Sequence, residues 1–169
     1  MLRKKFNEYF PAIDKSSYLD FTAVIIGKVK IGRNVFVGPG VVIRADVPGS
    51  LITIEDNCNV QDRVIIHALE DSSVLIKKNC SLAHGCIIHG PCKIDKNCFI
   101  GFGSVVFNTK IGEGVVIKHL AVVDGVDVSS ERVVGSGGVI NRQEKAKELK
   151  TVDMALKNFT QNVVKVNLD

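Results

Sequence analysis

The sequence predicts an all-β protein, a parallel β-helix of hexapeptide repeats that ends in a C-terminal α-helix. Three features of the 169 residues predict this fold. Aliphatic residues recur every six positions, small residues follow them by four positions, and the last part of the chain is rich in helix-forming residues. Self-similarity at a short fixed period is the signature of a solenoid, in which stacked repeats bury one continuous core.

The aliphatic column sets the strands and the coils. Each six residues are expected to form a short strand and a corner, with the aliphatic side chain filling the interior. Three strands complete one triangular coil, and coils stack about 4.8 Å apart in the hydrogen-bonding direction. Residues eighteen apart should therefore share a face, apart from slips of eleven, ten and five residues in the register. The column consists of Ile13, Leu19, Ile25, Ile31, Val37, Ile43, Ile54, Val60, Ile66, Ile76, Leu82, Ile88, Ile94, Ile100, Val106, Ile111, Ile117 and Val123.

The small column is expected to fit near the turns of each coil. The pattern of the two columns resembles the left-handed β-helix family. The left-handedness rests on that resemblance, because ordinary parallel crossovers are right-handed. The small column consists of Ser17, Ala23, Val29, Val35, Val41, Val47, Cys58, Val64, Cys80, Cys86, Cys92, Cys98, Ser104, Val115 and Ala121.

All five cysteines fall in the small column, at Cys58, Cys80, Cys86, Cys92 and Cys98. A free thiol at such a position behaves as a compact apolar side chain. We therefore expect the cysteines to serve packing, in preference to a metal cluster or disulfides. Reduced thiols also fit a cytosolic protein.

The end of the chain predicts helices. We expect a single domain in which residues 1–140 form the β-helix and residues 141–169 form a helical segment that packs on it. Residues 143–149 are strong helix formers and predict a short helix. A longer helix is predicted over about residues 153–166, with Asp153 as its N-cap. Its expected apolar stripe consists of Met154, Leu156, Phe159, Val163 and Val166.

Composition and charge exclude several classes of function. The net charge is only +4, and the basic residues are scattered without interleaved aromatic residues, so we expect no nucleic-acid partner. No apolar run is long enough for a transmembrane helix, so no membrane partner is expected. Basic residues at the N-terminus are not followed by the apolar stretch of a signal peptide. These observations predict a cytoplasmic protein.

Three of the four histidines lie within a short stretch and outside both inward columns, so their side chains should point outward. Allowing for a loop after Ile66, we expect the coil that begins at Leu82 to stack over the coil that begins at Ile66. This register places His67 and His84 on one face in adjacent coils and His89 on the next face. The fourth, His119, also points outward without a partner in register and is expected to be structural or solvated.

Outward ligands on a convex prism do not enclose a metal within one chain, so a second subunit would have to complete the site. A triangular prism makes a homotrimer natural. Three imidazoles with an open fourth position form the ligand set of a catalytic zinc site. Surface histidines are usually solvated, and the spacing alone leaves the metal site and solvated histidines as equally open interpretations.

Polar residues accompany the histidines. Arg44 and Asp46 follow Ile43, and they suit either an intersubunit ion pair or a solvated pair of little energetic value. Gln61 and Asp62 follow Val60. The amide of Gln61 is able to hold a hydroxide or a substrate oxygen.

These segments resemble those of the γ-class carbonic anhydrases, and more closely the enzyme and carboxysomal scaffold branch than general hexapeptide transferases. The resemblance covers most of the chain. The matching segments are Ile43-Arg44-Ala45-Asp46, Asn59-Val60-Gln61-Asp62, Val64-Ile65-Ile66-His67-Ala68, Ser81-Leu82-Ala83-His84, Ile88-His89-Gly90-Pro91, Phe99-Ile100-Gly101-Phe102 and Val163-Val164-Lys165-Val166-Asn167.

The resemblance implies a homotrimer with one metal per interface, Zn2+ or else Fe2+ or Co2+. It implies that His67 and His89 come from one subunit and His84 from its neighbour. Across that interface Arg44 and Asp46 would pair, supported by Asp62. Gln61 would orient the attacking hydroxide, and Asn167 matches an active-site amide near the C-terminus of the family.

The sequence departs from the family pattern in three places. Val47 stands where the archetype has a glutamate of its proton-transfer apparatus, which puts fast turnover in doubt. The acidic loop after the first ligand is short, and Glu70 matches the family's shuttle glutamate or is a solvated loop residue. Lys165 replaces an aromatic residue.

The resemblance predicts reversible hydration of CO2 to bicarbonate, with CO2 and bicarbonate as small-molecule partners. Two other hypotheses remain open. Many hexapeptide proteins transfer acyl groups from coenzyme A with a histidine base. A non-catalytic, metal-stabilised trimer that docks into a larger assembly would also use these residues.

Overall fold

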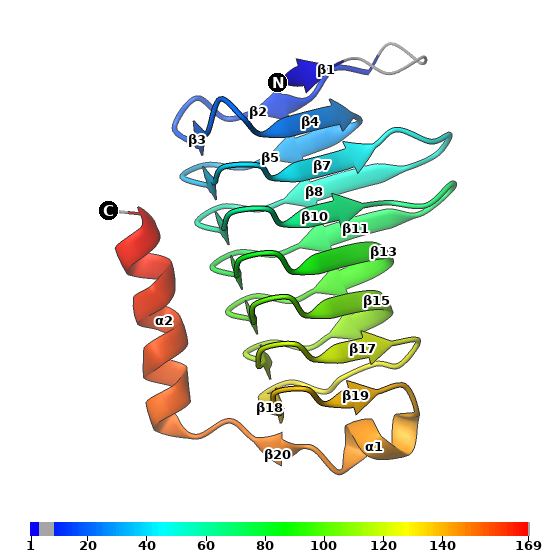
Figure 1. Cartoon of the computed structure of the whole chain (residues 1–169), viewed down its shortest axis with the longest axis vertical. Coiled ribbons are helices and arrows are strands. Elements are labelled where there is room, and N and C mark those ends of the chain that lie inside the picture. Colours follow the sequence, from blue (N-terminus) through cyan, green and yellow to red (C-terminus); the bar gives the residue numbers. More distant parts are fainter. Residues whose placement is uncertain (4–8, 169) are drawn as a thin grey trace.

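The computed structural model describes residues 1–3 and 9–168, and it is a left-handed parallel β-helix with a C-terminal α-helix, as the sequence predicts. The coils stack into a tall triangular prism, and the N-terminus lies at the end of the prism opposite α1 (Figure 1). Every strand pair between successive coils is parallel, and the antiparallel pair of β18 (Arg132–Val134) with β20 (Lys150–Thr151) closes the last coil. No described helix has the length and apolar character needed to cross a membrane.

The prism has three faces, which are named here for what they carry. The histidine face consists of β1 (Leu2–Arg3), β4 (Val24–Gly27), β7 (Val42–Ala45), β10 (Ile65–His67), the first part of β13 (Ile87–Ile94), the first part of β15 (Val105–Ile111), β17 (Val122–Asp124) and β19 (Val139–Ile140). The lysine face consists of β2 (Ala12–Ile13), β5 (Val29–Ile31), β8 (Leu51–Ile54), β11 (Ser73–Ile76) and the remainders of β13 and β15. The helix face consists of β3 (Tyr18–Leu19), β6 (Phe36–Val37), β9 (Asn59–Val60), β12 (Ser81–Leu82), β14 (Phe99–Ile100), β16 (Val116–Ile117), β18 and β20.

The aliphatic column fills the interior as predicted. Ile43, Ile66 and Ile88 stack in successive coils of the histidine face and are completely buried. Leu82 stacks on Val60 in the helix face in the same way. Burial of such side chains contributes about 1.5–3 kcal/mol each, so the repeat itself supplies the main stabilisation.

Two coils are longer than eighteen residues. Ile43 pairs with Ile66 and Ile66 pairs with Ile88, whereas Ile25 pairs with Ile43 and Ile88 with Val106 at the regular spacing. The extra residues form loops after β7 and β10, which protrude from the prism (Figure 1). Residue Val47, expected in the small column, lies in the first of these loops, and Ala45 is buried in its coil instead.

The predicted stacking of Leu82 over Ile66 is therefore wrong. The step of ten positions from Ile66 to Ile76 crosses a single corner, with the surplus in the loop, and does not make up two shortened repeats. Leu82 consequently stacks on Val60, and Ile66 stacks on Ile88. This changes which histidines are neighbours.

The cysteines pack as predicted, and all five are buried free thiols. Cys58, Cys80 and Cys98 occupy equivalent corners of three successive coils, and each Sγ lies 3.1 Å from a backbone carbonyl oxygen of the next coil. Burial raises the pKa of both Cys86 and Cys92 to about 12. They remain thiols at neutral pH and behave as small apolar side chains.

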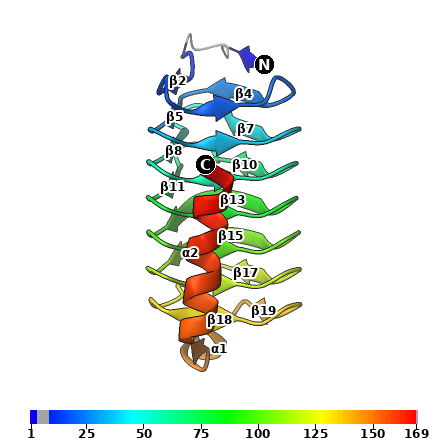
Figure 2. The same cartoon turned by 90° about the vertical axis from the view of Figure 1, so that its left-hand side faces the viewer.

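The C-terminal segment forms α1 (Gln143–Lys147) and α2 (Met154–Leu168). The backbone N–H of Leu156 donates to Asp153 Oδ1 over 2.8 Å, which confirms the predicted N-cap. α2 runs along the helix face of the prism (Figure 2), where Leu156 and Val163 pack on a cluster that includes Phe99. Met154 and Val166 are exposed, so the apolar stripe is narrower than predicted.

Candidate metal centre

His67 and His89 are register partners on β10 and β13, so their side chains leave the same face one coil apart. His67 Nδ1 lies 3.0 Å from His89 Nε2, and the two rings meet edge to face with centroids 4.8 Å apart. Both side chains are half-buried. The predicted arrangement, with His84 stacked on His67 and His89 on another face, is corrected by this register.

An ion pair lies beside His67 in the preceding coil. Arg44 is the register partner of His67, and its Nε and terminal nitrogen donate to Asp46 Oδ2 over 3.2 and 3.0 Å. Asp46 Oδ1 lies 3.3 Å from His67 Nε2. Within one chain, therefore, Arg44 and Asp46 pair with each other, and the carboxylate bridges the guanidinium and the imidazole.

The surroundings favour the neutral imidazole of His67. Burial lowers the pKa of His67, and the positive charges of Arg44 and His89 lower it further, whereas Asp46 acts in the opposite direction. The Nε2 atom is buried and lies beside Asp46 Oδ1. A neutral ring with an available lone pair is the form in which histidine binds metals, so the donor chemistry of this pair fits a divalent cation.

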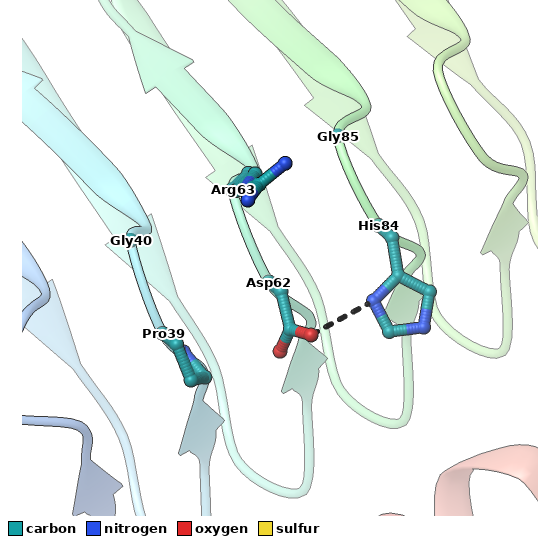
Figure 3. Close-up of a pocket in the computed structure, with 6 residues that line it drawn as sticks. All are labelled: Pro39, Gly40, Asp62, Arg63, His84 and Gly85. Carbon is teal, nitrogen blue, oxygen red and sulfur yellow. Dashed lines mark ion pairs between the residues drawn. The ribbon is translucent and has the colours of Figure 1, made fainter.

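His84 lies at a different place, on the corner between the helix face and the histidine face. Its side chain is 51% exposed, and its Nδ1 lies 3.4 Å from Asp62 Oδ2 in the preceding coil. Figure 3 shows the two side chains facing one another. They line an open hollow of about 620 Å³. A carboxylate at one ring nitrogen fixes the orientation of an imidazole and leaves the other nitrogen for a ligand.

The three histidines do not meet within one chain. Across the part of the chain that the structure describes, no three side chains of His, Cys, Asp or Glu gather closely enough to hold a metal ion. The pair of His67 and His89 faces outward from one side of the prism, and His84 faces outward from its corner. The chain thus displays two parts of a donor set on separate surfaces.

Gln61 is held by a buried polar chain. Its Nε2 donates to Asn59 Oδ1 over 2.6 Å, and Asn59 Nδ2 donates to Ser81 Oγ over 3.1 Å. Asn59 and Ser81 are completely buried. These hydrogen bonds fix the amide of Gln61 next to Asp62 at the corner that carries His84.

The other predicted residues lie farther from these groups or outside the described part. Glu70 is an exposed residue of the loop after β10, and Val47 is half-buried in the loop after β7. The side chain of Asn167 lies outside the described residues.

The sequence reasoning missed several aromatic neighbours of the histidines. Phe107 is the register partner of His89, and their ring centroids lie 5.4 Å apart. On the corner, Phe102 packs against His84, and His119 stacks on Phe102. The sequence signal for these neighbours is that each lies at a fixed distance from an inward aliphatic residue. This spacing predicts a contact only when it is known which aliphatic residues stack in adjacent coils.

An aliphatic strip along the histidine face was also missed. One residue before each inward aliphatic residue, the outward position is again aliphatic, and Ile65 and Val139 are 41% and 47% exposed. The sequence signal for this strip is that two aliphatic residues stand side by side in each of these strands, one pointing inward and one outward. The strip consists of Val24, Val42, Ile65, Ile87, Val105, Val122 and Val139.

Comparisons with known proteins identify relatives of this chain in sequence and in fold. The family described as "Bacterial transferase hexapeptide (six repeats)" matches residues 73–108. The carbonic anhydrase of Methanosarcina thermophila is 35% identical over 179 residues, which span 94% of this chain and 72% of that protein. The carboxysome assembly protein CcmM of Nostoc sp. is 38% identical over 165 residues, 92% of this chain but 30% of that protein. The chain thus spans less than a third of that carboxysome assembly protein.

A solved structure titled as a putative acetyltransferase of Bacillus cereus superposes with a TM-score of 0.85. The alignment covers 98% of this chain and 91% of that chain at 23% identity. At this identity the likeness extends to the fold.

Proposed function

Since the chain belongs to the hexapeptide-repeat family that includes the γ-class carbonic anhydrases, we propose that it catalyses the reversible hydration of CO2 to bicarbonate. In this proposal the protein is a homotrimer. A divalent metal, Zn2+ or alternatively Fe2+ or Co2+, is held at each interface by His67 and His89 of one subunit and His84 of the next.

The observation that carries the proposal is the placement of the three histidines on two separate surfaces of the chain. His67 and His89 bring two ring nitrogens within 3.0 Å on one face, while His84 stands on a corner with Asp62 at its Nδ1. A convex prism presents such donors outward. Two copies related by the rotation of a closed trimer bring the corner of one against the face of the other.

The aliphatic strip supports contact between copies. Ile65, Ile87 and Val105 lie between the corner and the histidine column, and Ile65 is 41% exposed. Contiguous exposed apolar residues mark protein–protein contacts. The strip borders the donors on the surface that the proposed interface would cover, so metal binding and assembly would occur together.

The donor set fits the metal. Three neutral imidazoles with one open position form a catalytic zinc site, and His67 Nδ1 and His89 Nε2 are the two ring nitrogens that face one another on this surface. When bound, such a metal lowers the pKa of water from 15.7 to about 7 and so supplies a nucleophile at neutral pH. Imidazole ligands suit iron and cobalt as well.

The protein's own residues orient the reactants. Gln61 is anchored through Asn59 and offers its amide to an oxygen of the nucleophile or of bicarbonate. Phe107 packs edge to face against His89. Asp46 holds His67 in place, and its ion pair with Arg44 neutralises the carboxylate. In the trimer, we expect this pair to extend across the interface together with Asp62.

The proton released by hydration must reach solvent. Val47 is unable to carry it, and Glu70 offers an exposed carboxylate in the neighbouring loop. We propose Glu70 as the exit group and Asn167 as a further amide at the site, and we expect turnover to be limited by proton transfer.

Adding Zn2+, Co2+ or Fe2+ to the purified protein under reducing conditions, and following CO2 hydration together with mass and metal content, tests the proposal. A metal-loaded trimer that hydrates CO2 above the buffer rate is expected. A metal-loaded trimer without such activity would contradict the enzymatic proposal.

An assembly role is the second candidate, favoured by the likeness to carboxysome assembly proteins over 92% of this chain. Substituting His84→Ala separates the two. If the variant loses activity but remains a trimer, His84 has a catalytic role. If the only effect is that the trimer dissociates, His84 has an assembly role. Tight binding of coenzyme A without metal would instead favour acyl transfer.

A further inference from the structure

Four side chains form a continuous ladder up one corner of the prism. Asp62, His84, Phe102 and His119 each lie two residues after an inward aliphatic residue, and those aliphatic residues stack in register in four successive coils. The ladder side chains therefore occupy equivalent corner positions, one above the other.

Each neighbouring pair in this ladder is in contact. Asp62 Oδ2 lies 3.4 Å from His84 Nδ1 on one side of the imidazole. On the other side, the rings of His84 and Phe102 have centroids 5.4 Å apart with an interplanar angle of 33°. The ring of His84 is thus held between a carboxylate from the preceding coil and a phenyl ring from the following coil.

Phe102 is in turn held by His119. Their rings stack with centroids 4.2 Å apart and an interplanar angle of 12°. The backbone N–H of Phe102 donates to His119 Nδ1 over 3.1 Å. Phe99, from the same coil as Phe102, meets the ring of His119 edge to face with centroids 6.4 Å apart.

The fold does not require aromatic side chains at this corner. Pro39 occupies the equivalent position in an earlier coil and Ser136 in a later one. Phe102 is 46% exposed, so it is not part of the buried core. Its ring contacts are those with His84 and His119.

We propose that Phe102 and His119 are positioning residues, which hold the imidazole of His84 in the orientation that presents Nε2 to a metal in the neighbouring subunit. This inference rests on the proposed function, since it assigns the ladder to one ligand of that metal. Phe102 limits rotation of the His84 ring, and His119 acts only through Phe102. Outer partners that hydrogen-bond to a metal-binding histidine, as Asp62 would here, change metal affinity about 10- to 100-fold, and we expect the ring contact of Phe102 to act at the low end of that range.

The experiment measures Co2+ affinity and the visible Co2+ absorption spectrum of the full-length protein, with trimer mass determined on the same samples. Phe102→Leu keeps apolar volume but removes the flat ring, and we expect it to weaken Co2+ binding about tenfold and to alter the spectrum. Phe102→Tyr keeps the ring and should bind as the unsubstituted protein does. His119→Ala should weaken binding in the unsubstituted background but add nothing to Phe102→Leu, because it acts through the same ring.

Phe21→Leu is the matched control. Phe21 occupies the same corner position three coils from His84 and is 89% exposed, so its removal should leave Co2+ affinity unchanged. Equal affinity and spectra for Phe102→Leu and the unsubstituted trimer would overturn the inference. If Phe102→Leu fails to assemble, His119→Ala decides, and unchanged Co2+ binding in that variant overturns it as well.

His84→Ala distinguishes failure of this inference from failure of the proposed function. If His84→Ala retains full Co2+ affinity, the interface site itself is wrong, and the inference falls with it. If His84→Ala loses Co2+ while Phe102→Leu and His119→Ala keep it, only the positioning role is wrong.

Discussion

His67 and His89 are register partners on adjacent strands, and 3.0 Å separates Nδ1 of the first from Nε2 of the second. This contact depends on the loop after β10. The loop takes up the surplus residues of the coil, so residues 22 positions apart lie side by side. His84 is excluded from the pair by the same register and stands on the corner.

The interior column predicts a large stability loss for Ile66→Ala. Ile66 is fully buried between Ile43 and Ile88, so truncation leaves a cavity that the stacked coils fill poorly. The free energy of unfolding should fall by about 2–5 kcal/mol. Denaturant unfolding measures this, and a change below 1 kcal/mol, on the order of a surface substitution, would contradict the assigned register.

Substitution of the adjacent residue, Ile65, should affect the trimer and leave the fold of the single chain intact. Ile65 points outward in the aliphatic strip, so Ile65→Ser should leave the far-ultraviolet circular dichroism of the chain unchanged while weakening the trimer. Sedimentation at a series of concentrations checks this. An unchanged trimer at the lowest concentrations would mean that the strip is not the interface.

The buried thiols predict a stability loss in alkali. The pKa of Cys86 is about 12 in the folded chain and near 9.0 when exposed, and Cys92 behaves alike. Between these values the unfolded chain has lost the thiol protons that the folded chain retains, so stability falls as the pH rises from about 9 to 12. The contribution is fully present below pH 9.

Chemical unfolding at several pH values, with reductant present, measures that slope. Cys86→Ala is a suitable comparison because Ala23 and Ala121 occupy the equivalent corner in other coils. The variant should lose stability less steeply with pH. An identical slope would show that Cys86 contributes nothing to the alkaline loss.

The fixed amide of Gln61 predicts a defect in turnover without a defect in metal binding. Gln61→Leu removes the amide that we assign to an oxygen of the nucleophile, and the rate of CO2 hydration should fall about a hundredfold. Metal content and trimer mass should not change. Glu70→Gln, measured alongside, should lower the maximal rate in weak buffer, and added buffer should restore it if Glu70 is the exit group.

Much of the fold follows from the sequence because each six-residue repeat contains both a strand and the corner that follows it. The aliphatic and small columns predicted the inward side chains, the packing role of the cysteines and the outward direction of the histidines. Asp153 was likewise recognised as the N-cap of α2, because side-chain oxygens at that position accept backbone N–H groups.

The neighbours of the histidines were harder to predict. An insertion in a solenoid sequence does not reveal at which corner of the triangular coil the surplus residues form a loop. If the loop is placed at the wrong corner, every following residue moves to the next face, and the neighbours of all outward side chains change. For this reason the sequence pattern predicts His84 beside His67, whereas the structure places it against Asp62 and Phe102. The stacking of His119 on Phe102 was missed for the same reason.

The most direct test of the interface site uses two inactive proteins. One carries His84→Ala and the other carries His67→Ala and His89→Ala, so neither forms an intact site alone. After mixing and reassembly, each mixed trimer pairs one intact face with one intact corner, which restores about one third of the metal sites of that trimer. Metal content and CO2 hydration should therefore reappear on mixing. If mixed trimers form but metal content and CO2 hydration stay at the level of the separate variants, the three histidines do not share a site between subunits.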